Sequence, residues 1–253
     1  QIGKGAFYEC YNLKSITFPS NTELKTLNIG NEAFADSKLS AFIVPNSVSE
    51  LNIGDLAFSV QVGGPGGSID YSSKLNTFTI LPTGNLKTLN IGDCAFAGSE
   101  LSNFIVPNSV NNPKIGHGAF FECKQLEQFI LPSNNPEFKN LLIGNEAFAG
   151  SGLSVFIVPN SVIELNIGDL AFSKQINENG ILRYESKLNT FIIPPNLKTL
   201  NIGICAFAGS ELSKFIIPNS VNILKIGYGA FFECKKLEQF ILPSNNPEFK
   251  NLL

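Results

Sequence analysis

The 253-residue sequence contains no methionine, no tryptophan and only one histidine. A single histidine cannot form a histidine cluster for a metal ion, and no Ser–His or Cys–His catalytic pair is suggested. Basic residues are not in excess, because 18 lysines and arginines face 21 aspartates and glutamates. The net charge of −3 therefore gives no reason to expect nucleic acid or an anionic membrane as a partner.

Several sequence signals are also missing. No apolar run approaches the roughly 18 residues of a membrane span, so we expect no direct membrane insertion of this segment. No signal-peptide segment, glycosylation sequon, calcium loop or phosphate loop occurs. The chain begins with Gln1, and we expect a fragment of a longer protein whose targeting signals lie elsewhere. We predict no cofactor, no metal and no catalytic residue.

Internal repetition is the dominant feature. The phrase I-G-x-x-A-F begins nine times, at Ile2, Ile29, Ile53, Ile91, Ile115, Ile143, Ile167, Ile202 and Ile226. Repeats of 24 residues alternate with longer ones, and the segment 119–142 recurs almost unchanged at 230–253. We therefore expect a single solenoid over 1–253, with one cassette at 2–114, a second at 115–225 and an extra repeat at 226–253.

Each repeat contains two short strand signals, complete in residues 39–58, which read LSAFIVPNSVSELNIGDLAF. Apolar residues recur with the period of two that is typical of strands. Pro45 closes the first strand because it cannot donate to a ladder, and Gly54 ends the second. Asp55 is then expected to cap a short helical turn, as are Asn31, Asp93, Asn145 and Asp169 in other repeats.

Coils of about 24 residues bury their leucine, phenylalanine and isoleucine only by stacking. The expected fold is a right-handed, leucine-rich-repeat-like solenoid of nine coils, mainly parallel β with short helical or 3-10 turns. Because paired strands lie about 4.8 Å apart, nine coils make a rod roughly 40 Å long.

The repeat LSAFIVPNSVSELNIGDLAF resembles the BspA-type, or Treponema pallidum-type, leucine-rich repeat, in which P-x-S-L is followed by I-G-x-x-A-F-x-x-C. Cys10, Cys123 and Cys234 match the terminal cysteine of that pattern. The resemblance implies a cell-surface or extracellular protein that acts in adhesion and protein binding. The extra Leu-Asn pair of LNIG and the insertions depart from the pattern, and they affect curvature and the outer face.

Five cysteines leave at least one thiol unpaired. Cys94 with Cys123, or Cys205 with Cys234, come from adjacent coils and could pair, but buried thiols are the favoured interpretation. The insertions at 59–74, which includes Gly63–Gly67, and at 173–186 are expected to be flexible excursions or variable contacts. His117 aligns with Lys4 and Tyr228, which indicates a solvated surface position.

One apolar column is not explained by the core. When Phe42 and Val44 point inward, Ile43 points outward. The equivalent positions are Thr17, Ile43, Thr79, Ile105, Ile130, Ile157, Ile192, Ile216 and Ile241. Isoleucine could simply suit a strand and shield its ladder from water. The alternative is a contact stripe, because contiguous exposed apolar patches tend to mark interfaces.

Three functions are compatible with these patterns. The leading hypothesis is a non-catalytic adhesion module that binds a protein ligand or a component of a host or neighbouring cell surface through the seven isoleucines. The alternative is self-association, as a stalk or fibre of stacked repeats. An enzyme is the weakest hypothesis, because the repeat pattern offers no pocket with paired catalytic groups.

Overall fold

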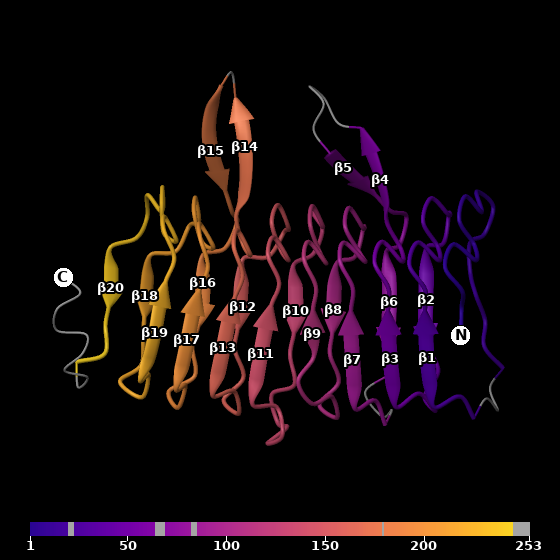
Figure 1. The fold of residues 1–253 in the computed structure, drawn as a ribbon, viewed down its shortest axis with the longest axis horizontal. Helices are drawn as coiled ribbons and strands as arrows, with labels where there is room; N and C mark the ends of the chain where they lie inside the picture. Colours follow the sequence, from indigo (N-terminus) through magenta and orange to yellow (C-terminus); the bar gives the residue numbers. More distant parts are fainter. Residues whose placement is uncertain (20–22, 64–68, 82–84, 179, 245–253) are drawn as a thin grey trace.

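A computed structural model describes residues 1–19, 23–63, 69–81, 85–178 and 180–244 of the protein. The chain winds into a row of stacked coils, and the colours of Figure 1 follow the sequence from one end of the row to the other. Two columns of strands run along this row, joined at one edge by tight turns. The expected solenoid is confirmed. The total of nine coils stays a prediction, because residues 245–253 of the last repeat lie outside the described part.

The first column is one parallel sheet of eight strands (Figure 1). Its members are β1 (Thr26–Ile29), β3 (Glu50–Ile53), β7 (Thr88–Ile91), β9 (Lys114–Ile115), β11 (Asn140–Ile143), β13 (Glu164–Ile167), β17 (Thr199–Ile202) and β19 (Ile223–Ile226). Pairing is in register, so that Leu51 lies beside Leu89 and Ile53 beside Ile91. Alternate side chains point into the core, as a period of two requires.

The second column is divided into two-stranded parallel sheets, β2–β6, β8–β10, β12–β16 and β18–β20. The strands are β2 (Ala41–Val44), β6 (Thr77–Ile80), β8 (Asn103–Ile105), β10 (Gln128–Ile130), β12 (Val155–Ile157), β16 (Thr190–Ile192), β18 (Lys214–Ile216) and β20 (Gln239–Ile241). Each strand hydrogen-bonds to one neighbour in the column, so this side of the solenoid is not a continuous sheet.

The I-G-x-x-A-F phrases form a turn edge between the two columns, and no helix occurs in the described residues. The expectation of a short helical turn capped by Asp55 is wrong. The second x of the phrase has φ between 51° and 62° in every repeat, at Gly5, Glu32, Leu56, Cys94, Gly118, Glu146, Leu170, Cys205 and Gly229. A right-handed helix needs φ near −60°.

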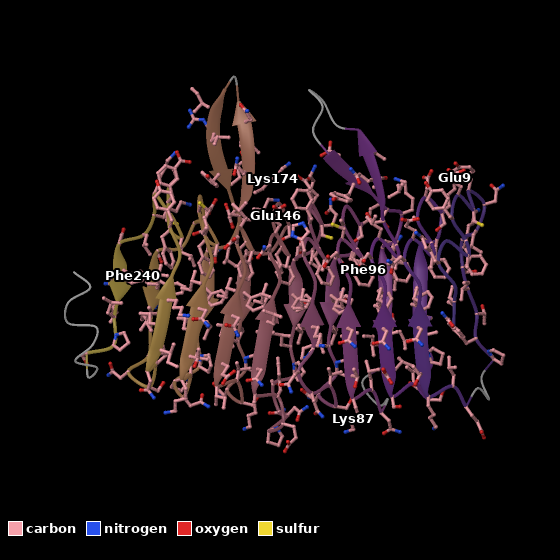
Figure 2. The ribbon with its side chains drawn as sticks, in the orientation of Figure 1. Glu9, Lys87, Phe96, Glu146, Lys174 and Phe240 are labelled. Atoms are coloured by element: carbon pink, nitrogen blue, oxygen red, sulfur yellow. The ribbon has the colours of Figure 1, made fainter. Side chains whose placement is uncertain are left out.

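Backbone hydrogen bonds explain why this edge is not helical. The N–H of Phe121 donates to the carbonyl of Gly118 within its own turn at 2.9 Å. The N–H of Phe120, one residue earlier, donates to Ala147 of the next coil at 2.8 Å. A helix would also use the N–H of Phe120 internally. In the turn conformation, this N–H is free to donate to the backbone carbonyl of the next coil. Glu9 and Glu146 lie along this edge in Figure 2, and Lys87 lies at the opposite corner.

The expected capping residues form a ladder between coils. Each carboxylate or amide Oδ1 accepts a backbone N–H at the equivalent position of the next coil, at 2.7–3.1 Å: Asn31 from Asp55, Asp55 from Asp93, Asp93 from His117, Asn145 from Asp169, and Asp169 from Ile204. The preceding glycine is required for this approach. A Cβ on Gly92 would lie 2.6 Å from Oδ1 of Asp55.

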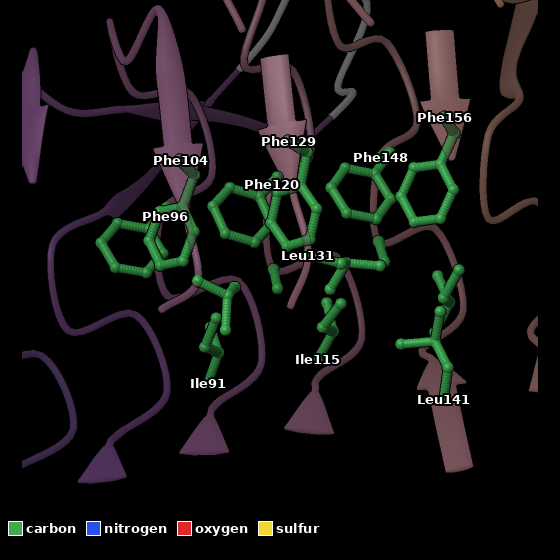
Figure 3. Close-up of a cluster of buried hydrophobic side chains, with 14 of the residues drawn as sticks. Ile91, Phe96, Phe104, Ile115, Phe120, Phe129, Leu131, Leu141, Phe148 and Phe156 are labelled. Atoms are coloured by element: carbon green, nitrogen blue, oxygen red, sulfur yellow. The ribbon is translucent and has the colours of Figure 1, made fainter. Parts of the chain in front are cut away.

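Two columns of phenylalanine rings fill the interior. Within a column the rings stack, as with Phe96 and Phe120 at 5.3 Å between centroids. Between columns they meet edge to face, as with Phe104 and Phe120 at 5.0 Å. In Figure 3 the labelled rings Phe96, Phe104, Phe120, Phe129, Phe148 and Phe156 lie side by side above labelled isoleucine and leucine side chains. Offset stacked and edge-to-face contacts are the arrangements that aromatic rings prefer.

The two insertions are antiparallel hairpins that leave the solenoid on the side of the turn edge (Figure 1). The strands are β4 (Val60–Gly63) with β5 (Ile69–Ser72), and β14 (Lys174–Glu178) with β15 (Ile181–Glu185). The sequence pattern did not predict these hairpins, and the expectation of flexible excursions or variable contacts stays a prediction. Of the glycine run, Gly63 ends β4, and residues 64–67 lie outside them.

A tyrosine anchors the base of each hairpin on later coils. Tyr71 meets Phe121 edge to face at 5.6 Å, and Tyr184 meets Phe232 in the same way at 5.7 Å. The carbonyl of Tyr71 lies so close over Gly98 that any Cβ there would collide with it. This contact ties the hairpin to the turn edge and requires glycine at that position.

Phe120→Ala should lower the free energy of unfolding by about 3–5 kcal/mol, because Phe120 is fully buried and the cavity would lie between four neighbouring rings. Urea denaturation followed by circular dichroism measures the change. Phe240→Ala is the control: Phe240 is 37% exposed, has two ring neighbours and should cost clearly less. Equal losses would contradict the view that the double column holds the coils together.

Candidate binding face

The outward-facing side of the second column is named here the isoleucine face. It comprises the outward side chains of β2, β6, β8, β10, β12, β16, β18 and β20. All seven isoleucines predicted to lie on it are exposed: Ile43, Ile105, Ile130, Ile157, Ile192, Ile216 and Ile241, with exposed fractions of 44–54%. Thr17 is also exposed, and Thr79 is half-buried. The column therefore points away from the core.

Strand register brings these isoleucines together in pairs. Ile105 lies beside Ile130, Ile157 beside Ile192, and Ile216 beside Ile241. Ile43 lies beside Thr79. Each pair sits on one two-stranded sheet, so the face is a series of ridges in which two isoleucines stand next to each other.

Apolar hollows separate some of these ridges. One of about 680 Å³ lies between β10 and β12; its lining includes the apolar residues Phe129, Ile130, Leu131, Val155, Ile157 and Pro159 and the polar residues Glu127, Gln128, Ser133 and Ser154. Another of about 390 Å³ lies between β16 and β18. The ring spacing in the core widens beneath the first hollow: Phe129 and Phe156 are 6.1 Å apart, whereas Phe104 and Phe129 within one ridge are 5.6 Å apart.

The isoleucine face carries almost no charge. Lys214 is the only charged residue among the outward-facing positions of its eight strands; the others are isoleucine, threonine, asparagine, glutamine, alanine or valine. An exposed surface that is both apolar and uncharged is the composition expected at the centre of a protein interface.

The outer surface of the eight-stranded sheet is different, and its main feature was missed at the level of sequence. Side chains of LNIG repeats form asparagine ladders. Nδ2 of Asn52 donates to Asn28 at 2.8 Å, and Nδ2 of Asn90 donates to Asn52 at 2.6 Å. Asn201 and Asn166 form a third such bond. Aligning the LNIG segments of successive repeats, in the same way as the FIVPNSV segments, would have shown that asparagines occupy equivalent outward positions.

These amides are already hydrogen-bonded to one another, and the ladder is interrupted by Lys114 of β9 and Leu142 of β11. Glu50 and Glu164 add charge to the same surface. The asparagine surface is therefore explained by bonds within the solenoid, whereas the isoleucines have no such explanation.

A buried ion pair at the turn edge is the second feature missed from sequence. Glu122 is 7% exposed and pairs with Lys174 of β14 and, at 2.9 Å, with Lys124. Burial alone would raise the pKa of Glu122, but hydrogen bonds and charge from the two lysines outweigh it and lower the pKa. The pair joins the second hairpin to an earlier coil of the same cassette, the one that contains residues 115–142. The sequence pattern does not reveal this pair, because the two residues are 52 positions apart in the chain.

The structure also places the single histidine and the acidic and cysteine side chains of the described residues. His117 is exposed, and the only bonds shown for it are made by its backbone, with Asp93 and Cys94. Across the described ranges, no group of three histidine, cysteine or acidic side chains is placed to hold a metal ion.

All five cysteines are free thiols. No disulfide joins Cys94 to Cys123 or Cys205 to Cys234. Burial raises the pKa of Cys123 to about 12, despite its contact with Ser99, and burial also raises the pKa of Cys94. A reactive thiolate needs a lowered pKa, so these two thiols fit a packing role.

Comparison with protein families assigns the repeat. The model of the family described as BspA type leucine rich repeat region (6 copies) matches residues 1–62, 68–179 and 142–252. The chain belongs to the BspA-type leucine-rich repeat family. The resemblance seen in the repeat sequence is thereby confirmed over most of the chain.

Three solved structures similar to this chain are a leucine-rich repeat protein from Bacteroides ovatus, the pneumococcal vaccine antigen PcpA, and a leucine-rich cell surface protein from Faecalibacterium prausnitzii. Their identities to it are 20%, 20% and 18%, with TM-scores of 0.47, 0.45 and 0.38. They cover 80%, 88% and 87% of this chain, which spans 55%, 57% and 65% of theirs.

A comparison with curated proteins finds no match for this BspA-type chain. Among its described residues, no helix is long and apolar enough to cross a membrane.

Lys174→Met should destabilise the protein by about 1–3 kcal/mol at neutral pH, because it leaves the Glu122 carboxylate buried with one partner fewer. The pKa of Glu122 is lowered in the folded state, so the ion pair stabilises the fold above the ordinary carboxyl range. That stabilisation is lost as the pH falls through the lowered pKa. The difference between variant and parent should therefore shrink on acidification.

Thermal denaturation of both proteins between about pH 3 and pH 7 measures this difference. Lys74→Met removes the exposed pair with Glu100 and serves as the control, with an expected cost of about 0–1 kcal/mol. A loss for Lys174→Met that stays constant over the whole pH range would show that the lysine stem, not its charge, stabilises the hairpin.

Proposed function

We propose that this chain is a non-catalytic protein-binding module of a cell-surface or secreted protein, and that it binds through the isoleucine face. The observation that carries the proposal is the column of seven isoleucines, each about half exposed, on a surface with one charged position. Single exposed isoleucines need no explanation, but a column that runs along most of a solenoid does.

The location and the adhesive role rest on membership of the BspA-type family together with the properties that the repeat resemblance implies. A protein ligand, or a component of a host or neighbouring cell surface, is the proposed partner class. We propose no nucleic-acid partner, because the chain has no excess of basic residues to attract phosphates.

Energetics favour this face over the asparagine surface. Covering exposed isoleucine removes apolar area from water at roughly 25 cal/mol per Å². Covering the asparagine ladders would offer a partner amides that already bond to one another, as Asn52 does to Asn28 and Asn90. The hollow between β10 and β12 also gives a partner side chain a recess whose mainly apolar walls include Phe129, Leu131 and Val155, with Glu127 and Gln128 among the polar residues that line it.

The triple substitution of Ile105, Ile130 and Ile157 by threonine should abolish binding and leave the fold intact. All three side chains are exposed, and threonine keeps β-branching on the strand while removing apolar area. Immobilised parent and variant are exposed to a cell-surface extract, and the proteins captured by each are compared by mass spectrometry.

Leu142→Thr is the matched control, because Leu142 is 52% exposed but lies on the asparagine surface. A protein retained by the parent and by the Leu142 variant, and lost from the triple variant, is the expected result. Identical capture by all three would refute binding through the isoleucine face.

A further inference from the structure

The ridges of the isoleucine face recur every two coils. The hydrogen-bonded pairs β8–β10, β12–β16 and β18–β20 each form one ridge. The hollows of about 680 Å³ and 390 Å³ lie in the two intervals between these ridges, β10 to β12 and β16 to β18. From β8 to β20, ridges and hollows therefore alternate with the same spacing, which makes this part of the face complementary to a copy of itself shifted by one coil.

We propose that a second copy of this chain occupies the isoleucine face. The two copies pack face to face about a two-fold axis that runs parallel to the strands, between the copies, at the position of β12. This proposal rests on the proposed function, because both require the isoleucine face to be a binding surface. What it adds is the identity of the partner, a second copy of the chain.

Symmetry selects this orientation. An axis parallel to the strands reverses the order of coils, so β10 of one copy faces β16 of the other, and β8 faces β18. The hollow between β10 and β12 then receives the ridge β12–β16, and the hollow between β16 and β18 receives the ridge β8–β10. An axis along the solenoid would instead place every ridge on itself and every hollow on itself.

The same operation superimposes the isoleucine columns. Rotation about an axis parallel to the strands leaves the position along each strand unchanged, so the column of one copy lies over the column of the other. Ile105 then faces Ile216, Ile130 faces Ile192, and Ile157 faces its own symmetry mate. A C2 interface uses one patch twice in this way and needs no second surface.

Charge favours a second copy. In a symmetric dimer the same surface of both copies is in contact, so a charged surface would place like charges opposite each other, which is unfavourable. Lys214 of β18 is the one charged outward position in these strands, and this axis places it opposite Asn103 of β8, not opposite another lysine. The asparagine surface, with Glu50, Lys114 and Glu164 in its strands, lacks this neutrality.

The size of the face predicts a weak dimer. An axis at β12 overlaps seven strands, from β6 to β20, over a length of roughly 34 Å at 4.8 Å per strand. With a width of about 16 Å, for five residues of strand and flank, each copy contributes on the order of 540 Å² of flat area. This corresponds to the transient class of interfaces, so association should depend on concentration.

The position of the axis makes Ile157 the most informative residue. Ile157→Lys places two like charges opposite each other, and Ile157→Glu does the same with negative charge. Each variant alone should associate at least tenfold more weakly than the parent. Mixing the two should restore a dimer, because lysine then faces glutamate across the axis. Both substitutions are at a position that is 54% exposed, which spares the core.

Sedimentation equilibrium from about 5 µM to about 500 µM measures the association of the parent, each variant and their equimolar mixture. Leu142→Lys, on the asparagine surface, is the control and should associate like the parent. Circular dichroism shows that each variant is folded. The expected pattern is a parent that approaches twice the mass of one chain, two monomeric variants and a mixture that dimerises.

Three results would overturn the inference: a parent that stays monomeric throughout, a dimer that survives Ile157→Lys, or a mixture that stays monomeric when both variants are folded. A monomeric parent that still captures a foreign protein, with capture lost in the Ile105, Ile130 and Ile157 triple variant, would reject the second copy while the proposed binding function stands. A parent that stays monomeric and also captures no foreign protein would reject both the second copy and the proposed binding function.

Discussion

The stacking distance between phenylalanine rings is the constraint on which the rest of the structure depends. Rings of the turn-edge column, such as Phe96, Phe120 and Phe148, follow one another at 5.3–5.4 Å. That spacing is close to the distance between hydrogen-bonded strands. Aromatic packing and backbone pairing can therefore be satisfied together in every coil. A coil alone would expose its rings to water, so stability is a property of neighbours rather than of single repeats.

Hydrogen bonds at the turn edge show how this constraint shapes local structure. Left-handed residues such as Glu146 and Cys94 sit in a backbone conformation that non-glycine residues adopt at some cost. The conformation is compensated because the turn bonds to the next coil through Phe120 and through the Oδ1 of Asp93. The hairpins take part in the same edge, where Tyr71 packs on Phe121 and Lys174 pairs with Glu122.

Sequence periodicity was sufficient for the strands and for the direction of the isoleucines. Alternation in Phe42-Ile43-Val44 assigns Ile43 to the outside, and the structure leaves it 54% exposed. The same reasoning failed where residues distant in sequence decide the environment. Asp55 was expected to cap a helix, but its Oδ1 binds the N–H of Asp93, 38 residues away. The short-range capping pattern cannot distinguish a local partner from one in the next coil.

What the sequence determined by itself is the stacking unit: two strands, a proline corner, a glycine that permits close approach, and inward rings. These follow from residue chemistry at a fixed period. The tertiary structure alone decided how coils join. Strands of the second column pair two by two, which divides the isoleucine column into ridges and hollows. Pairing depends on the relative position of whole coils, and that position is set by packing among all neighbours, not by any one repeat.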